Sequence, residues 1–276
     1  MTTSGAALSG HGLRLAYHGT VVVPGADVAL APGRVTALVG PNGSGKSTVL
    51  RALARLHRAE AGDVRLDDQD ASALSAKEFA RRVTLLSQSR PTPSGVSVRE
   101  VVGYGRHPYR GRWRQDDPDG ARAIAWAMEV TGVAAMAERA VDELSGGERQ
   151  RVWLATCLAQ DTRVLLLDEP TTYLDLRYQV EILDLVRDLA DEHGVAVGVV
   201  LHDLDQAAAV ADHVVLLSRG EVVGAGTAVE VLTADALTAT YGLRVEVTVH
   251  DGVVRTHPVG RHVRRRRPAE PELAPL

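Results

Sequence analysis

The chain has 276 residues, of which 45% are hydrophobic and 24% are charged, and its net charge is −4. These values predict a globular protein with one large domain or two closely packed ones, and they disfavour a disordered chain. The negative net charge disfavours general polyanion binding by the chain as a whole. No apolar run approaches the roughly 20 residues that span a bilayer, and we expect no secretory signal at the N-terminus.

The single cysteine, Cys157, excludes an internal disulfide and is typical of a protein in a reducing cytosol. It lies in an apolar segment, so we expect a packed thiol rather than a reactive one.

In chain order, residues 13–39 alternate β-rich stretches with turn residues, which predicts an antiparallel strand group that leads into a strand at 34–39. A glycine-rich turn and a helix at 46–56 follow. Beyond them, strand signals alternate with helical patterns. The expected strands are 83–87, 164–167, 195–201 and 213–218, and the expected helices are 178–192 and 203–211. Several of these strands are continuous apolar runs, so the pattern predicts an α/β core with a mostly parallel sheet.

Strand signals vanish between residues 91 and 158, where apolar residues follow helical spacing at 98–103 and 121–128. We therefore expect a helical subdomain inserted into the core. Near the C-terminus, Asp251-Gly252 lies between β-branched residues and predicts a hairpin.

The predicted organisation has four parts. A discontinuous nucleotide-binding core takes residues 1–90 and 159–242, the helical subdomain takes 91–158, a β-hairpin extension takes 243–260, and a tail takes 261–276. Five arginines between residues 261 and 267 precede a Pro/Glu-rich end. We expect a solvated, disordered tail, with contact to anionic lipid headgroups or nucleic acid as the alternative.

A phosphate-binding pattern, G-x-x-x-x-G-K-[ST], is matched by Gly40-Pro41-Asn42-Gly43-Ser44-Gly45-Lys46-Ser47. Its glycines allow a tight turn whose backbone N–H groups face phosphate oxygens, and the following helix N-terminus adds donors and a favourable dipole. Lys46 can reach the β- and γ-phosphates of ATP, and the Ser47 hydroxyl can ligate Mg²⁺. An apolar strand is expected before the turn and a helix after it, which favours a phosphate site over an incidental glycine-rich turn.

Two carboxylates, Asp168 and Glu169, follow the apolar run at 164–167. In open α/β sheets, ligands bind at the carboxyl ends of the strands. We expect Asp168 to bind Mg²⁺ and Glu169 to orient and polarise an attacking water. Alone this pattern is weak, but together with the phosphate loop it indicates a nucleotide-hydrolysing site.

The segment Leu144-Ser145-Gly146-Gly147-Glu148-Arg149-Gln150 carries a capping box, because Glu148 follows Ser145 by three residues. Placed between a phosphate loop and an acidic strand end, it also resembles the signature of the ABC ATPase family. The resemblance extends from about residue 8 to residue 242, with several motifs in the family's order.

The resemblance implies a role for each matching position. Tyr17 matches the aromatic residue that stacks on adenine, and Gly40 through Thr48 match the loop that holds the phosphates. Gln88 matches the glutamine that contacts Mg²⁺ and senses a membrane partner, and His202 matches the histidine that touches the γ-phosphate. The residues expected to act in catalysis are Glu169, His202, Lys46 and Gln88. Because these positions are intact, a regulatory module without turnover is disfavoured.

The resemblance also implies a dimer. In this family the signature residues, here Ser145, Gly146 and Gly147, contact the ATP that is held by the other copy, and Asp175 matches an aspartate that crosses between subunits. The chain has one phosphate loop, one signature and no internal repeat. It therefore needs a second ATPase subunit, most simply a second copy of itself.

Separate ATPase subunits resemble those of bacterial importers, which work at the cytoplasmic face of the membrane with integral permease subunits. A periplasmic or lipoprotein substrate-binding protein takes part indirectly, and the ATPase does not contact the cargo. The segments at 100–109 and 171–179, the latter with Tyr173, resemble the branch that serves iron-siderophore, haem and cobalamin uptake. We favour iron-siderophore import, with haem, cobalamin or a metal ion as alternatives.

The helical subdomain and the loop after Gln88 are expected to contact the permease. We therefore expect substitution of Gln88 or Arg106 to weaken transport more than it weakens ATP binding.

A competing hypothesis is a soluble ABC ATPase that acts on ribosomes or DNA. Ribosome-associated members usually carry two ATPase units, and DNA-repair members usually carry a long coiled coil between the two halves. This sequence shows neither feature, and only the arginine cluster of the tail favours nucleic acid.

Overall fold

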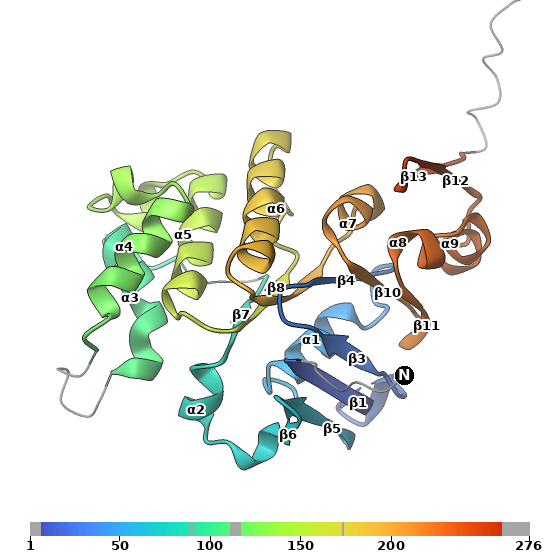
Figure 1. The fold of residues 1–276 in the computed structure, drawn as a ribbon, viewed down its shortest axis with the longest axis horizontal. Helices are drawn as coiled ribbons and strands as arrows, with labels where there is room; N and C mark the ends of the chain where they lie inside the picture. The colour runs from blue at the N-terminus through green and yellow to red at the C-terminus, as the bar shows by residue number, and fades with distance from the viewer. Residues whose placement is uncertain (1–6, 89, 91, 111–116, 173, 261–276) are drawn as a thin grey trace, which may run out of the picture.

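The computed structural model describes residues 7–260 except 89, 91, 111–116 and 173, and Figure 1 shows its layers around a central sheet. The expectations for Tyr173 and for the arginine-rich tail concern residues outside this described part. Among the described residues, no helix is both long enough and apolar enough to cross a membrane.

The central sheet has six strands in the order β11-β10-β4-β9-β8-β7. These are β4 (Val35–Val39), β7 (Val83–Leu86), β8 (Val164–Asp168), β9 (Ala196–Val200), β10 (His213–Ser218) and β11 (Glu221–Gly226). Five of them pair in parallel, and β11 pairs antiparallel to β10 at one edge. Every residue of β4, β8 and β9 is buried, which explains why their sequences are continuous apolar runs.

Each face of this sheet contributes to a different core. Because side chains alternate along a strand, Leu165 and Leu167 of β8 pack on one face and Val164 and Leu166 pack on the other. Helices α6 (Leu176–Asp191) and α7 (Leu204–Val210) cover the first face, and α1 (Lys46–Leu53) lies on the second (Figure 1). The expected α/β core is confirmed, although α1 ends earlier than the pattern predicted.

A second, antiparallel sheet lies beyond α1 and has the order β2-β1-β5-β6, with β3 also paired to β1. Its strands are β1 (Leu8–Tyr17), β2 (Thr20–Val23), β3 (Val28–Leu30), β5 (Ala61–Leu66) and β6 (Gln69–Asp70). The first three confirm the expected N-terminal strand group. The apolar pattern did not indicate β5 and β6. Strand β6 has two residues, both exposed, and β5 has a single buried residue, so neither carries a continuous apolar run.

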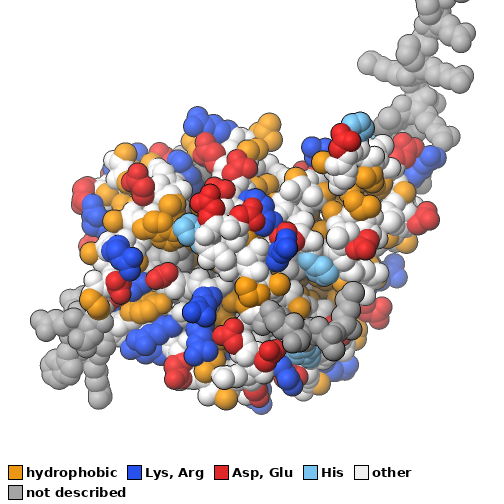
Figure 2. Space-filling model, in the orientation of Figure 1, with side chains coloured by type: hydrophobic (Ala, Val, Ile, Leu, Met, Phe, Trp, Pro, Cys, Tyr) orange, Lys and Arg blue, Asp and Glu red, His pale blue; other side chains and the backbone are white. Residues whose placement is uncertain are grey.

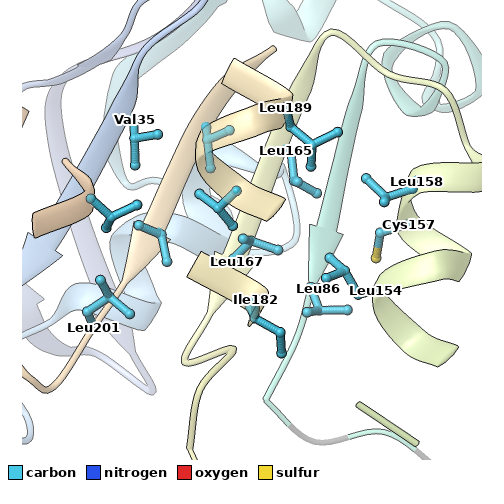
Figure 3. Packing of buried hydrophobic residues seen from close by; sticks show 14 of the residues in the cluster. Val35, Leu86, Leu154, Cys157, Leu158, Leu165, Leu167, Ile182, Leu189 and Leu201 are labelled. Atoms are coloured by element: carbon cyan, nitrogen blue, oxygen red, sulfur yellow. The ribbon is translucent and has the colours of Figure 1, made fainter. Parts of the chain in front are cut away.

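Helical elements follow β7 and form the side of the molecule drawn in green in Figure 1. A short α2 (Ala76–Ala80) precedes β7, and α3 (Val98–Gly103), α4 (Gly120–Val130) and α5 (Gly146–Ala159) come after it. In this part of the described chain the only β pairing is the isolated bridge between Ser97 and Ala140. Figure 3 shows Leu154 and Cys157 of α5 packed toward Leu86, at the end of β7. Helix α5, which starts in the signature segment and is called the signature helix below, is thus packed directly against β7, the strand that leads to Gln88.

The side chain of Arg106 holds this helical region together from inside. It is only 2% exposed. Its guanidinium donates two hydrogen bonds to Asp117, at 2.8 and 2.6 Å, and one to the carbonyl of Ala159 at 3.0 Å. The ring of Tyr109 lies 3.8 Å away. The guanidinium of Arg106 is thus taken up by internal partners, so a substitution there also disturbs internal packing. The expected effect of Arg106 substitution on transport stays a prediction.

The C-terminal part packs on α7. Helices α8 (Ala228–Val231) and α9 (Ala234–Tyr241) precede strands β12 (Val245–His250) and β13 (Val253–Pro258), which pair antiparallel. Asp205, in the first turn of α7, accepts hydrogen bonds from the backbone N–H and the hydroxyl of Thr256, at 2.8 and 2.9 Å. The hairpin is therefore fixed to the helix that begins just after His202.

Candidate nucleotide-binding and catalytic site

The turn between β4 and α1 needs its glycines. Gly40 has φ 142°, and a Cβ there would lie 2.0 Å from the carbonyl oxygen of Leu217. Gly45, directly before the helix, has φ 100°. Side chains at these positions would be strained or would clash, so the turn keeps its backbone open to a ligand. The buried hydroxyl of Ser44 has no hydrogen-bond partner among the described residues, which leaves a free donor in the turn.

Lys46, the first residue of α1, closes the turn from inside. It is 4% exposed, and its Nζ donates to the carbonyl oxygens of Gly40 and Pro41, each at 2.8 Å. Burial lowers the pKa of Lys46, and the nearby carboxylates of Glu169 and Asp168 oppose that shift. A desolvated cation at a helix N-terminus is a strong site for a phosphate group.

Asp168 and Ser47 meet across the sheet–helix boundary. The Ser47 hydroxyl donates to Asp168 Oδ1 at 2.6 Å, and Arg51 Nη2 lies 3.4 Å from Asp168 Oδ2. Asp168 is completely buried at the end of β8. A hydroxyl and a carboxylate oxygen side by side are the donor types that Mg²⁺ prefers, so the pair fits a magnesium site beside the phosphates.

Glu169 is held from two sides. Gln88 Nε2 donates to its Oε2 at 2.6 Å, and His202 Nε2 lies 2.6 Å from its Oε1. The backbone of Glu169 has φ 56°, an unusual conformation for a residue that is not glycine. Such strain is often found at functional positions, and Glu169 lines the same cavity as the phosphate-binding turn.

The turn, the start of α1 and the Glu169 contacts border one cavity of about 450 Å³. The expected site residues Gly40, Pro41, Ser44 and Asp168 are not among the residues that line it. Of the residues expected to act on ATP, its walls include Asn42, Gly43, Gly45, Lys46, Ser47, Thr48, Gln88, Glu169 and His202. Residues far apart in the sequence thus converge because β4, β7, β8 and β9 are parallel and all end at this edge of the sheet.

Other expected site residues lie outside the cavity. Ser145 begins α5, where it and Glu148 form the expected capping box. Asp175 begins α6, where its carboxylate accepts from the N–H of Tyr178. Both are at helix N-termini on the surface, and neither contacts the phosphate loop of its own chain. Tyr17 is 38% exposed and packs on His57, with ring centroids 4.4 Å apart.

Sequence reasoning missed Thr172 and Arg51. The Thr172 hydroxyl lies 3.4 Å from Glu169 Oε2, and Thr172 lines the cavity. Arg51 lies one helical turn after Ser47, on the same face of α1, so the i, i+4 spacing could have placed it near Asp168. No comparable signal marked Thr172, which is positioned by the turn after β8.

A phosphate-binding turn, a buried aspartate and a glutamate held at a parallel sheet edge define a P-loop nucleotide-binding protein. The family model described as ABC transporter matches residues 23–172. The chain belongs to this family, and it is an ATPase subunit.

Curated relatives cover nearly the whole chain. The ferric enterobactin transport ATP-binding protein FepC of Escherichia coli is 42% identical over 267 residues, which are 95% of this chain and 97% of that protein. The iron(3+)-hydroxamate import ATP-binding protein FhuC of Bacillus subtilis is 42% identical over 87% of this chain and 89% of its own length. The hemin import ATP-binding protein HmuV of Rhodococcus jostii is 44% identical over 88% of this chain and 82% of its own length.

Solved structures show the same fold. A chain from a transporter described as of the metal-chelate type, in an inward-facing conformation, superposes with a TM-score of 0.79 at 27% identity, covering 93% of this chain and 98% of its own. The dimeric bacterial ABC transporter cassette MJ0796 gives 0.70 at 25% identity, covering 80% of this chain and 98% of its own.

Proposed function

We propose that this chain binds MgATP in the cavity at the β4–α1 turn, hydrolyses it as one half of a dimer, and energises the import of a ferric siderophore. The observation that carries the catalytic part is the position of Glu169, held by Gln88 and His202 at the wall of the phosphate cavity. The cargo is supported by the relatives, because ferric enterobactin and iron-hydroxamate proteins match along most of the chain.

Lys46 and the turn N–H groups would hold the β- and γ-phosphates of ATP. Ser47 and Asp168, with Gln88, would hold Mg²⁺, which supplies charge neutralisation for the transferring phosphoryl group. Glu169 would orient a water in line with the γ-phosphate and accept its proton. His202 would donate to a γ-phosphate oxygen through its imidazole. Tyr17, backed by His57, would offer its exposed ring face to the adenine.

The site needs a second copy. Ser145, Gly146 and Gly147 stand at the exposed N-terminus of α5, away from the chain's own cavity. A helix N-terminus with two glycines favours a phosphate brought by another subunit. Asp175 would cross the same interface. ATP would then join the two copies, and loss of the γ-phosphate would let them separate.

We place part of the permease contact at a groove lined by Leu56, Phe79 and Leu85. Leu56 is 71% exposed, which is unusual for a leucine, and it would pack against an apolar helix of the membrane subunit. Leu85 lies on β7, the strand that leads to Gln88, so a partner bound there would act on the loop that contacts Glu169.

A role on nucleic acid has no support on the face shown in Figure 2, where lysines and arginines are interspersed with acidic side chains rather than gathered in one basic surface.

The decisive experiment uses the Glu169→Gln variant, purified with MgATP in mild detergent from cells that carry the native transport genes. Co-purification of a polytopic membrane protein supports the importer, whereas ribosomal proteins or DNA without such a protein contradict it. Uptake of radiolabelled iron as its siderophore complex, measured in a strain that lacks the gene, tests the cargo. Unchanged iron uptake together with lost haem or cobalamin uptake would replace the siderophore in this proposal.

A further inference from the structure

A closed ring of contacts joins the Gln88 loop, the end of β8 and the signature helix. Gln88 Nε2 donates to Glu169 at 2.6 Å, and Pro170, the next residue, accepts from Gln150 Nε2 at 2.8 Å. The other end of the Gln150 amide accepts from Arg90 Nη1 at 3.3 Å. Arg90 Nε in turn donates to the carbonyl of Ser87 at 2.6 Å, which returns the ring to Gln88.

The chemistry of the ring fixes the orientation of the Gln150 amide. The guanidinium of Arg90 only donates, and the carbonyl of Pro170 only accepts. The amide oxygen must therefore face Arg90 and its nitrogen must face Pro170. An amide side chain offers an acceptor and a donor side by side, and asparagine, the other amide, is one methylene shorter.

A buried arginine usually forms an ion pair with a carboxylate. In the part of the chain that the structure describes, no carboxylate pairs with Arg90. Burial lowers the pKa of Arg90 to about 10, which still leaves it charged at neutral pH, and Asp168 is the carboxylate whose charge acts on it most directly. A desolvated charge without a paired carboxylate is costly, and the two hydrogen bonds that Arg90 donates to Ser87 and Gln150 offset part of that cost.

We propose that Arg90 is a positioning residue that couples the Gln88 loop to the signature helix. A displacement of Ser87 and Gln88 is transmitted through Arg90 and Gln150 to α5, whose N-terminus carries Ser145 to Gly147. The same amide holds Pro170, directly after Glu169. The loop beside the membrane subunit, the carboxylate that orients water and the surface that meets the other copy's ATP therefore move as one unit.

The ring has a weak point. The contact between Arg90 and Gln150 is its longest, at 3.3 Å, whereas the other three are 2.8 Å or shorter. It is also the contact that joins the loop to α5. This contact is therefore the one to which the test is directed.

This inference rests on the proposed ATPase function, so the test begins with turnover of the wild-type protein and its absence in Glu169→Gln. If the wild type does not hydrolyse ATP, the proposed function fails, independently of the ring. Given turnover, a double-mutant cycle of Arg90→Ala and Gln150→Ala tests the ring, with KM, kcat and melting temperature measured for each variant. Arg99→Ala, which removes an exposed arginine of α3, is the control.

We expect each single variant to lower kcat about tenfold with KM for ATP within about twofold, and the double variant to be no slower than either. Arg90→Lys keeps the charge but replaces the two separate donor nitrogens, Nε and Nη1, by one, and Gln150→Glu keeps the acceptor but cannot donate to Pro170. We therefore expect neither variant to restore kcat. If the two effects on kcat multiply, so that kcat of the double variant falls nearly a hundredfold, the proposal is overturned. It is also overturned by a loss of kcat that disappears when the assay is run well below each variant's melting temperature, because that result marks a purely structural role.

Discussion

The imidazole Nε2 of His202 lies 2.6 Å from Oε1 of Glu169, and this contact joins the ends of two neighbouring parallel strands, β9 and β8. The histidine follows its strand by two residues and the glutamate by one, so the parallel register brings them to the same edge. Gln88 occupies the other carboxylate oxygen. The carboxylate is thus held at both oxygens, which suits the general-base role that we propose for Glu169.

Replacing Glu169 by Gln should lower kcat for ATP hydrolysis by about 10²–10⁴-fold while leaving the affinity for ATP nearly unchanged. The amide has the same shape but cannot accept a proton from water. Steady-state phosphate release and equilibrium binding of a fluorescent ATP analogue measure the two quantities. Weakened ATP binding with normal turnover per bound nucleotide would show that Glu169 contacts the nucleotide instead of activating water.

Replacing Arg106 by Ala should lower the free energy of unfolding by about 3–5 kcal/mol, because the change leaves Asp117 partly buried without its partner. Chemical denaturation followed by circular dichroism measures it. Arg122→Ala is the matched control, since that arginine pairs with Asp119 on the exposed surface of α4 and should cost at most about 1 kcal/mol. Equal costs for the two variants would contradict the internal role of Arg106.

Burial raises the pKa of the Cys157 thiol to about 11. The unfolded chain loses this proton at lower pH than the folded protein does, so between about pH 9 and pH 11 the folded state binds more protons and stability falls as pH rises. Relative to Cys157→Ala, the wild type should lose up to about 3 kcal/mol of unfolding free energy over that range. If the free energy of unfolding changes with pH in the same way in both proteins, the thiol is solvated rather than buried.

The sequence located the groups of the site because each of them ends a strongly apolar strand or opens a helix. Lys46, Asp168, Glu169 and His202 all have such a position, and parallel strands bring them together without knowledge of the loops. Arg90 and Gln150 could not be found in this way. Their contact depends on how the helical elements pack against β7, and an arginine in a polar loop or a glutamine on a helix carries no periodic signal.

The same limit applies to Arg106, whose sequence neighbourhood is rich in polar and aromatic residues typical of a surface. Its burial depends on Asp117 and on the end of α5, which no local pattern connects. Strands β5, β6 and β11 were also missed, because their partly exposed residues lack the apolar runs of the central strands.

Replacing Thr256 by Val should loosen the C-terminal hairpin by about 1 kcal/mol, since the variant keeps its size but loses the hydroxyl that donates to Asp205. Hydrogen exchange of the β13 amides should accelerate several-fold, and the first turn of α7 should exchange faster with it. Thr248→Val is the control, because Thr248 is exposed on β12 and faces away from that contact. Faster exchange confined to the hairpin, with α7 unchanged, would mean that the hairpin packs on α7 without stabilising it. Faster exchange in both would show that the extension steadies the helix that follows His202.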